Sequence, residues 1–176
     1  MKGGENVQKK SWGVEDSLQM KIEEYSPMVY RLAYSLVKCK EDADDIHQEV
    51  FIKYIKKQPS FENTEHEKAW FIRVTINLCK NWWKTAWKQR FVSLTEFEDA
   101  GGEVAVSQDM LCDEDRELIE KVKMLDQKYR VVIHLFYYEE LSVEEIAAVL
   151  GQKASTVRTH LTRARRKLRD LLKEDM

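Results

Sequence analysis

Hydrophobic side chains recur at three- and four-residue spacing through most of the first ninety positions, which is the period of amphipathic helices. A first run spans Leu18 to Val37, and Ser26-Pro27 inside it predicts a helix that restarts or kinks there, because proline suits a first helical turn. A second run spans Asp42 to Lys57 and stops at Gln58-Pro59-Ser60. Its apolar positions at helical spacing are Ile46, Val50, Phe51, Tyr54 and Ile55, of which Ile46, Val50 and Tyr54 are predicted to face inward.

A third helix is predicted to open at Thr64-Glu65-His66-Glu67, which has the form of a capping box, and to run to about Trp87. Residues 1–16, ahead of the first run, show no sustained periodicity and are expected to be a mobile tail. The pattern therefore predicts a first domain of three or four helices over residues 17–92.

The helical pattern stops over residues 93–113, where Gly101-Gly102 and many acidic residues replace apolar periodicity, so this segment is predicted to be a flexible acidic linker. Residues 114–176 then predict a second domain of four helices, most of them short. The expected fold is all-α, with two small helical domains.

The last two helices have the pattern of a helix-turn-helix. A short helix from about Val143, after the capping-box residue Ser142, ends at Gly151, and a longer one starts near Ser155. Ala147 is small enough for the helix crossing, and Gly151 tolerates the positive φ of the turn. The predicted wedge between the helices is filled by Ile146, Leu150, Val157 and Leu161.

Ser155 is positioned to cap the second of these helices, and the outer face of that helix carries hydroxyl and guanidinium groups that can read a major groove. The candidate duplex-DNA residues are Ser155, Thr156, Arg158, Thr159, Thr162, Arg163 and Arg166. The alternative is a solvated basic run that the negative end of the helix dipole favours.

Charge along the 176 residues is segregated, although the net charge is only −2. Residues 68–90 hold six basic and no acidic side chains, residues 151–176 hold eight basic against three acidic, and residues 93–117 hold nine acids and one base. Basic stretches attract phosphate backbones, whereas the acidic stretch between them is repelled by phosphates. Chance clustering on solvated helices is the alternative explanation.

Other classes of function lack support in the composition. The three cysteines form no CxxC pair and have no histidine at metal-ligand spacing, which indicates reduced thiols and no metal or cofactor. No apolar run approaches the roughly 20 residues of a membrane span, so a cytoplasmic protein is expected. The four histidines lack a nearby nucleophile or phosphate loop, so an enzyme acting on a small-molecule substrate is disfavoured.

The third predicted helix combines tryptophans with cations, as single-stranded DNA binding requires, since flat rings stack on unpaired bases and cations bind phosphates. The aromatic residues are Trp70, Phe71, Trp82, Trp83 and Trp87, and they interleave with Arg73, Lys80, Lys84 and Lys88. The alternative is that some of these tryptophans, above all Trp70, are buried in the core.

Several segments resemble the extracytoplasmic-function sigma factors of the sigma-70 family. Tyr25–Tyr34, Glu41–Phe51 and Trp70–Asn77 resemble region 2, whereas Leu141–Ala147 and Ser155–Arg165 look like region 4. The resemblance covers about 150 residues in the family's order. It implies an alternative sigma factor that directs core RNA polymerase to promoters, melts the −10 element with region 2 and reads the −35 element with region 4.

The resemblance also implies residue roles. Polymerase contacts are expected at Asp45, Gln48, Glu49 and Phe51. The alternative is an ordinary solvent-exposed helix face, on which Asp42, Asp45 and Glu49 lie in line with Lys53 and the acids pair with that lysine. The −10 candidates are Phe61, Arg73, Asn77, Lys80, Trp83, Lys84 and Trp87. In the pocket for an extruded base, Phe61 would form an aromatic wall and Asn77 would hydrogen-bond to the edge of the base. The family often has an acid and an arginine four and seven positions after that asparagine, whereas this chain has Asn81 and Lys84.

The implied partners are the β′ and β subunits of core polymerase, promoter DNA and an anti-sigma factor, which can hold the protein at the membrane until an envelope stress signal arrives. The acidic linker would then mimic nucleic acid inside the polymerase. The rival functions are a polymerase-independent regulator with the same helix-turn-helix, which would bind duplex DNA tightly alone, and an enzyme.

Overall fold

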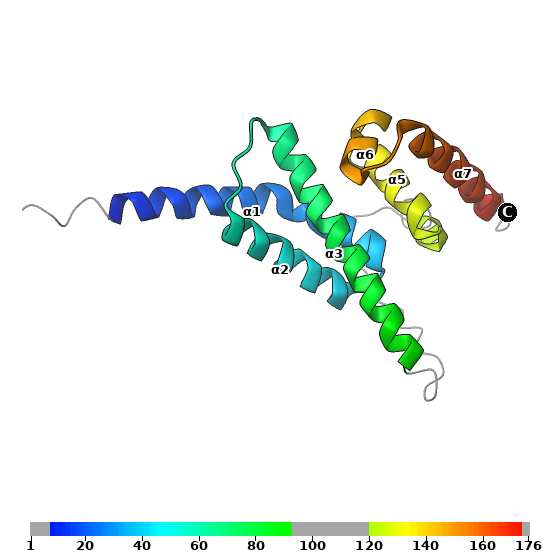
Figure 1. Cartoon of the computed structure of the whole chain (residues 1–176), viewed down its shortest axis with the longest axis horizontal. Coiled ribbons are helices and arrows are strands. Elements are labelled where there is room, and N and C mark those ends of the chain that lie inside the picture. The colour runs from blue at the N-terminus through cyan, green and yellow to red at the C-terminus, as the bar shows by residue number, and fades with distance from the viewer. Residues whose placement is uncertain (1–7, 93–119, 174–176) are drawn as a thin grey trace, which may run out of the picture.

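The structure is a computed structural model that describes residues 8–92 and 120–173, with side chains described over 17–85 and 120–173. Three helices of the first domain pack on one another: α1 (Gln8–Val37), α2 (Lys40–Lys57) and α3 (Thr64–Val92) (Figure 1). The second domain contains α5 (Gln127–Tyr137), α6 (Val143–Leu150) and α7 (Ala154–Lys173), and residues 120–124 before it are also helical. These ranges contain no strand, which confirms the predicted all-α fold. The predicted linker over 93–113 lies outside them.

Helix α1 is longer than its apolar pattern predicted. It begins at Gln8 and continues through Pro27 as one helix, so residues 8–16, which the sequence placed in a tail, are helical. Apolar periodicity reports only the part of a helix that packs on a core, and a helix can extend beyond that part. Lys38 ends α1 with a left-handed φ of 65°, and its backbone N–H donates to the Tyr34 carbonyl at 2.9 Å.

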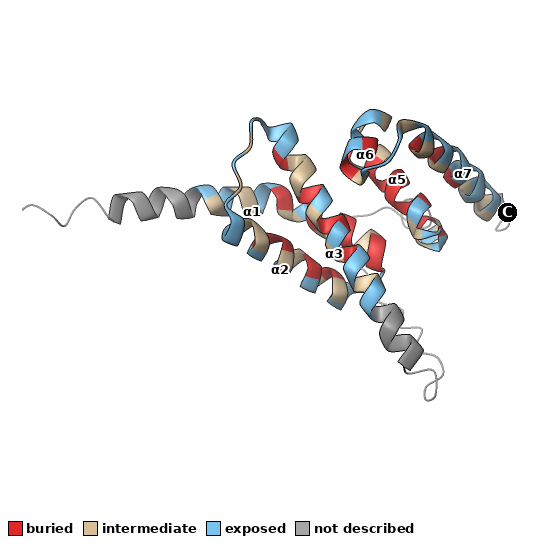
Figure 2. Ribbon diagram, in the orientation of Figure 1, coloured by how far each residue is buried: buried red, intermediate tan, exposed pale blue. Residues whose placement is uncertain are grey.

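The first domain's core is built around Phe71 of α3, which has no exposed surface. Its ring centroid lies 4.4 Å from that of Tyr25, 5.0 Å from Tyr54, 5.1 Å from Trp70 and 5.6 Å from Phe51. The inward faces of α1, α2 and α3 are buried together (Figure 2). Ile55, the last apolar position of the pattern, is 44% exposed, because the buried face of α2 is formed by Ala43, Ile46, Val50 and Phe51.

The start of α3 differs from the predicted capping box. The Asn63 side chain accepts a hydrogen bond from the His66 backbone N–H at 2.8 Å, so Asn63 is the capping residue, one position before Thr64. Glu67 is buried, and its carboxylate accepts hydrogen bonds from Lys21 at 2.7 Å and from Tyr25 at 3.2 Å. The acid at this position thus joins α3 to α1 rather than capping its own helix.

The second domain confirms the helix-turn-helix. Ser142 and Glu145 form a reciprocal capping box at the start of α6, and Gly151 ends that helix with a φ of 63°. An added Cβ at Gly151 would meet nothing within 4 Å, so the positive φ is what requires glycine there. Ile146, Val157 and Leu161 are buried in the wedge as predicted. Ser155 lies inside α7, which begins at Ala154, so its predicted capping role is wrong.

We expect Ser142→Ala to lower the free energy of unfolding by about 1 kcal/mol, because it removes the side-chain oxygen that accepts from the Glu145 N–H. Urea denaturation measures the loss, and Ser142→Asp, which retains a capping oxygen, should recover most of it.

Hydrogen bonds from Ser142 lower the pKa of Glu145. The stabilisation from the ionised Glu145 carboxylate should therefore be complete above the ordinary glutamate pKa. It should be lost as the pH falls through the lower pKa of Glu145 in the folded protein.

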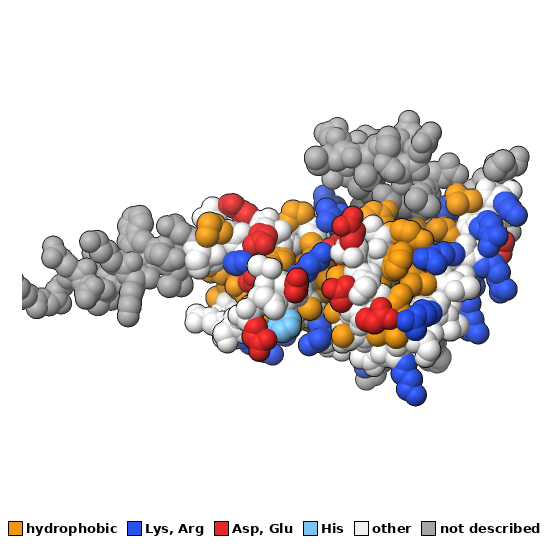
Figure 3. All heavy atoms as spheres, turned by 90° about the horizontal axis from the view of Figure 1, so that it is seen from above, with side chains coloured by type: hydrophobic (Ala, Val, Ile, Leu, Met, Phe, Trp, Pro, Cys, Tyr) orange, Lys and Arg blue, Asp and Glu red, His pale blue; other side chains and the backbone are white. Residues whose placement is uncertain are grey.

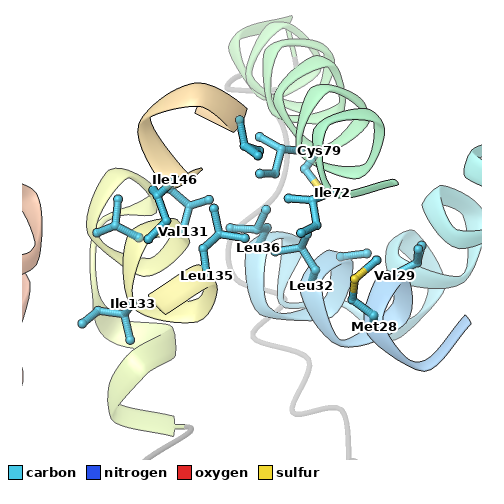
Figure 4. Close-up of a cluster of buried hydrophobic side chains, with 14 of the residues drawn as sticks. Met28, Val29, Leu32, Leu36, Ile72, Cys79, Val131, Ile133, Leu135 and Ile146 are labelled. Atoms are coloured by element: carbon cyan, nitrogen blue, oxygen red, sulfur yellow. The ribbon is translucent and has the colours of Figure 1, made fainter. Parts of the chain in front are cut away.

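The two domains pack against each other rather than standing apart. Helix α5 lies on α1, and α6 lies on α3. Buried side chains of both domains form one cluster, in which Leu32, Leu36 and Ile72 of the first domain approach Val131, Leu135 and Ile146 of the second (Figure 4). The domain division predicted from the sequence therefore coexists with a shared apolar interface.

Candidate nucleic-acid interface

A basic and polar face runs along α3, on the side opposite to its buried residues. Arg73, Asn77, Lys80 and Lys84 are all exposed and follow one another at three- and four-residue intervals, which places them on one side of the helix over about 16 Å. We call these four residues the α3 stripe. The structure thus brings together four of the seven residues that the sequence assigned to −10 DNA.

Phe61 and Trp70 lie at the N-terminal end of the α3 stripe. The Phe61 ring, in the loop before α3, meets Trp70 with centroids 6.0 Å apart in an edge-on arrangement, and both side chains are half-buried. Trp70 in turn packs on Tyr54 and Phe71. Trp70 therefore contributes to the core and also supports an aromatic ring next to the stripe.

Trp82 and Trp83 lie off the stripe. The Trp82 indole N–H donates to the Asp42 carboxylate at 2.8 Å, and the Trp83 indole N–H donates to the Leu36 carbonyl at 3.3 Å. Both side chains are half-buried, so in this arrangement they join α3 to α2 and α1. The side chain of Trp87, another predicted −10 residue, lies outside the described residues.

The outer face of α2 combines acids with exposed apolar side chains. Asp45 and Gln48 are exposed, and the Glu49 carboxylate lies 3.1 Å from the Lys53 ammonium. Ile52 and Ile55, which are 40% and 44% exposed, follow on the same side. We call Asp45, Gln48, Glu49, Ile52 and Ile55 the α2 face.

The structure corrects one member of the predicted polymerase-contact set. Phe51 is 6% exposed and its ring packs on His47 and Phe71, so it belongs to the core rather than to the α2 face. Ile52 and Ile55 were not among the contacts predicted from the sequence. Their spacing of seven and ten residues from Asp45 could have placed them beside that acid.

The outer face of α7 carries the predicted duplex-DNA residues. All of them are exposed except Thr156, which is half-buried, while Val157, Leu161 and Ala164 hold the helix on the domain core. Lys and Arg side chains gather at the end of the molecule formed by α7 (Figure 3). Arg158 makes an ion pair with Glu144 at 2.6 Å, which fixes its guanidinium beside α6. We call Ser155, Arg158, Thr159, Thr162, Arg163 and Arg166 the α7 face.

His160 does not contribute charge to the α7 face. Its ring is half-buried edge-on against Tyr129, with centroids 5.7 Å apart. Burial lowers the pKa of His160, and the positive charges of Lys128 and Arg163 lower it further. The imidazole is therefore neutral at pH 7, and the positive charge of this face comes from its arginines.

The described residues offer no group of three or more metal-ligating side chains. Among the described helices, none combines the length and the apolar character needed to cross a bilayer. Within this part of the chain, the candidate functional features are thus the α2 face, the α3 stripe with Phe61, and the α7 face.

Comparison with known proteins identifies both domains. Residues 22–89 match the family model for sigma-70 region 2, and residues 115–168 match that for sigma-70 region 4. RNA polymerase sigma factor SigV of Bacillus subtilis is 32% identical over 158 residues, covering 88% of this chain and 91% of the relative. The ECF RNA polymerase sigma factor SigW of the same organism is 27% identical over 172 residues, covering 92% of each chain.

A solved structure is similar across both domains. The sigma factor RpoE of Bartonella quintana, in complex with the anti-sigma factor NepR, matches with a TM-score of 0.74 and 25% identity, over 91% of this chain and 99% of that one. The α3 stripe lies in the part that matches region 2, and the α7 face lies in the part that matches region 4. The chain therefore belongs to the extracytoplasmic-function sigma factors of the sigma-70 family and is an alternative sigma factor for transcription initiation.

Proposed function

We propose that each of the three surfaces has a separate binding role in transcription initiation. The α2 face docks on core RNA polymerase, the α3 stripe with Phe61 binds the melted −10 element, and the α7 face with Thr156 reads the −35 element as duplex. The observation that carries the proposal is the pair of cationic faces, one in each domain of a chain with both sigma regions. The protein acts without a catalytic residue or a cofactor, in the cytoplasm, where polymerase and promoters are.

The α3 stripe suits single-stranded DNA for a physical reason. Extruding a base from a duplex costs a few kcal/mol, and stacking on an aromatic ring returns roughly 1 to 3 kcal/mol. Phe61 provides such a ring, braced by Trp70, while Arg73, Lys80 and Lys84 provide cations for phosphates and Asn77 provides an amide for a base edge. Trp83 and Trp87, which the sequence also assigned here, would contribute at the C-terminal end of α3.

Run-off transcription tests the proposed function. Transcripts should appear only when core polymerase and this chain are both present. Duplex DNA should bind the chain alone only weakly. Tight duplex binding without polymerase, together with no effect on polymerase, would instead identify a polymerase-independent regulator.

Removing two arginines of the α7 face should reduce promoter use. We expect Arg163→Ala with Arg166→Ala to lower run-off transcription at least about tenfold, since each contact of an arginine with a base or phosphate contributes roughly 1 to 3 kcal/mol. Lys173→Ala, which removes an exposed cation in the last turn of α7, is the control and should change it little. Equal activity of the double variant and the control would exclude the α7 face from promoter recognition.

An anti-sigma partner is proposed for this chain by analogy, because the similar sigma factor RpoE was solved with the anti-sigma factor NepR. Such a partner would hold the chain inactive, at the membrane if it is itself anchored there, until an envelope stress signal arrives. The acidic linker, outside the described residues, would run through the polymerase between the two DNA-binding domains.

A further inference from the structure

A buried carboxylate follows directly after the loop that carries Phe61. This loop joins the end of α2 to the start of α3 (Figure 1). Residues 55–66 are all exposed or half-buried, so Glu67 is the first buried residue of α3 after the loop, with a side chain that is 8% exposed. The contacts of Glu67 therefore help to set where the loop ends and α3 begins.

The Glu67 carboxylate binds side chains from both other helices of the first domain. From α1, Lys21 donates to it at 2.7 Å and Tyr25 at 3.2 Å, and the Tyr54 hydroxyl of α2 donates to the other carboxylate oxygen at 3.4 Å. Burial, and after it the charge of Glu67, raises the pKa of Tyr25 to about 12, so its hydroxyl remains a donor at neutral pH. We call these four residues the Glu67 network.

The Glu67 network reaches Phe61 through two aromatic contacts. The Tyr54 ring meets Trp70 with centroids 5.8 Å apart, and Trp70 meets Phe61 with centroids 6.0 Å apart. Trp70 follows Glu67 by three positions, so both side chains project from the same side of α3. A shift of the start of α3 would therefore displace Trp70 and the ring that it supports.

A buried charge holds one geometry more strictly than an apolar contact does. Apolar burial is non-directional, so packed rings tolerate small shifts. A carboxylate that has left water recovers the cost only if its partners keep good hydrogen-bond geometry. A binding site in turn needs its side chains held within about 0.5 Å of the productive position. The Glu67 network can supply that precision beside Phe61.

We propose that Glu67 is a positioning residue for the −10 site. Through its network it fixes the start of α3, and through Tyr54 and Trp70 it holds Phe61 in place before a base is extruded. The inference rests on the proposed function, in which Phe61 stacks on that base. A ring that is already in place avoids the cost of ordering the loop while the base leaves the duplex.

The principal test measures run-off transcription by Glu67→Gln, which keeps the size of the side chain but removes its charge. The template is a promoter selected from a random DNA library by the wild-type holoenzyme, either fully paired or with a mismatched, already open −10 segment. We expect the paired template to lose at least about fivefold and the open template less than about twofold. Only the paired template requires capture of a base as it leaves the duplex.

Two further measurements on Glu67→Gln separate positioning from a general defect of the first domain. The backbone amides of residues 60–66 should exchange their hydrogens faster than in the wild type. The affinity for core polymerase should stay the same, because the α2 face is unchanged. Equal losses on both templates, weaker polymerase binding or unchanged exchange would each overturn the proposal.

Lys21→Met tests the same contact from its half-buried partner, whose side chain is 30% exposed, and so applies even if Glu67→Gln fails to fold. It should also reduce transcription from the paired template more than from the open one. Combined with Glu67→Gln, it should cause no loss beyond that of Glu67→Gln alone, because both changes remove one contact. Losses that multiply would contradict the shared role.

Glu24→Gln is the matched control, because it removes an exposed carboxylate of α1 that binds the same lysine at 3.1 Å. It should match the wild type on both templates. Phe61→Ala separates this inference from the function on which it rests. If Phe61→Ala lowers transcription from the paired template and Glu67→Gln does not, only the positioning role is wrong. If Phe61→Ala has no effect either, the proposed −10 role of Phe61 is wrong as well.

Discussion

Asp45→Lys together with Glu49→Lys is expected to weaken binding of core RNA polymerase by about a hundredfold or more. The double change reverses both acids of the α2 face, and mispairing charges across an interface costs several kcal/mol. It also replaces Glu49, which pairs with Lys53 at 3.1 Å in the wild type, so that three cations lie along this face. Titration of core polymerase with fluorescently labelled chain measures the loss.

The control for this prediction is Glu23→Lys with Asp170→Lys, which makes the same change in net charge at two exposed acids outside the three faces. We expect it to bind polymerase like the wild type. Ile52→Ala with Ile55→Ala should weaken binding with only a small decrease in the unfolding temperature, because both side chains are substantially exposed. Unimpaired binding by the Asp45 and Glu49 double variant would remove the α2 face from the proposed function.

Phe71→Ala is expected to lower the free energy of unfolding by about 3 to 5 kcal/mol, which is the usual cost of emptying a buried phenylalanine site. Phe71 has no exposed surface and touches the rings of Tyr25, Tyr54, Trp70 and Phe51. A loss of this size is a large part of the total stability of a small protein. Urea denaturation followed by circular dichroism measures it.

The matched control for Phe71 is Ile55→Ala, which removes an apolar side chain that is 44% exposed and should cost less than about 1 kcal/mol. Similar losses for the two variants would contradict the placement of Phe71 at the centre of the core. Because Phe71 joins all three helices of the first domain, its loss should also impair the α2 face and the α3 stripe together.

Local sequence determined the parts of this protein that depend on neighbouring residues. The spacing of apolar residues predicted α2, α3, α6 and α7, and the Ser142–Glu145 capping box and the Gly151 turn predicted the helix-turn-helix before any contact was known. The α7 face and the cations of the α3 stripe followed from residue type and period, whereas Asn77 was assigned only through the family resemblance. Such features arise within one or two helical turns, where the sequence contains all the interacting groups.

Only the tertiary structure decided features that depend on distant residues. Phe51 and Ile55 both fit a buried period, yet packing of α2 on α1 and α3 buries the first and exposes the second. Glu67 binds Lys21 instead of capping its helix, and Arg130 reaches Leu36, ninety-four positions away. Periodicity shows that a face is apolar or charged but not which partner covers it, because the partner is chosen by the packing of the whole chain.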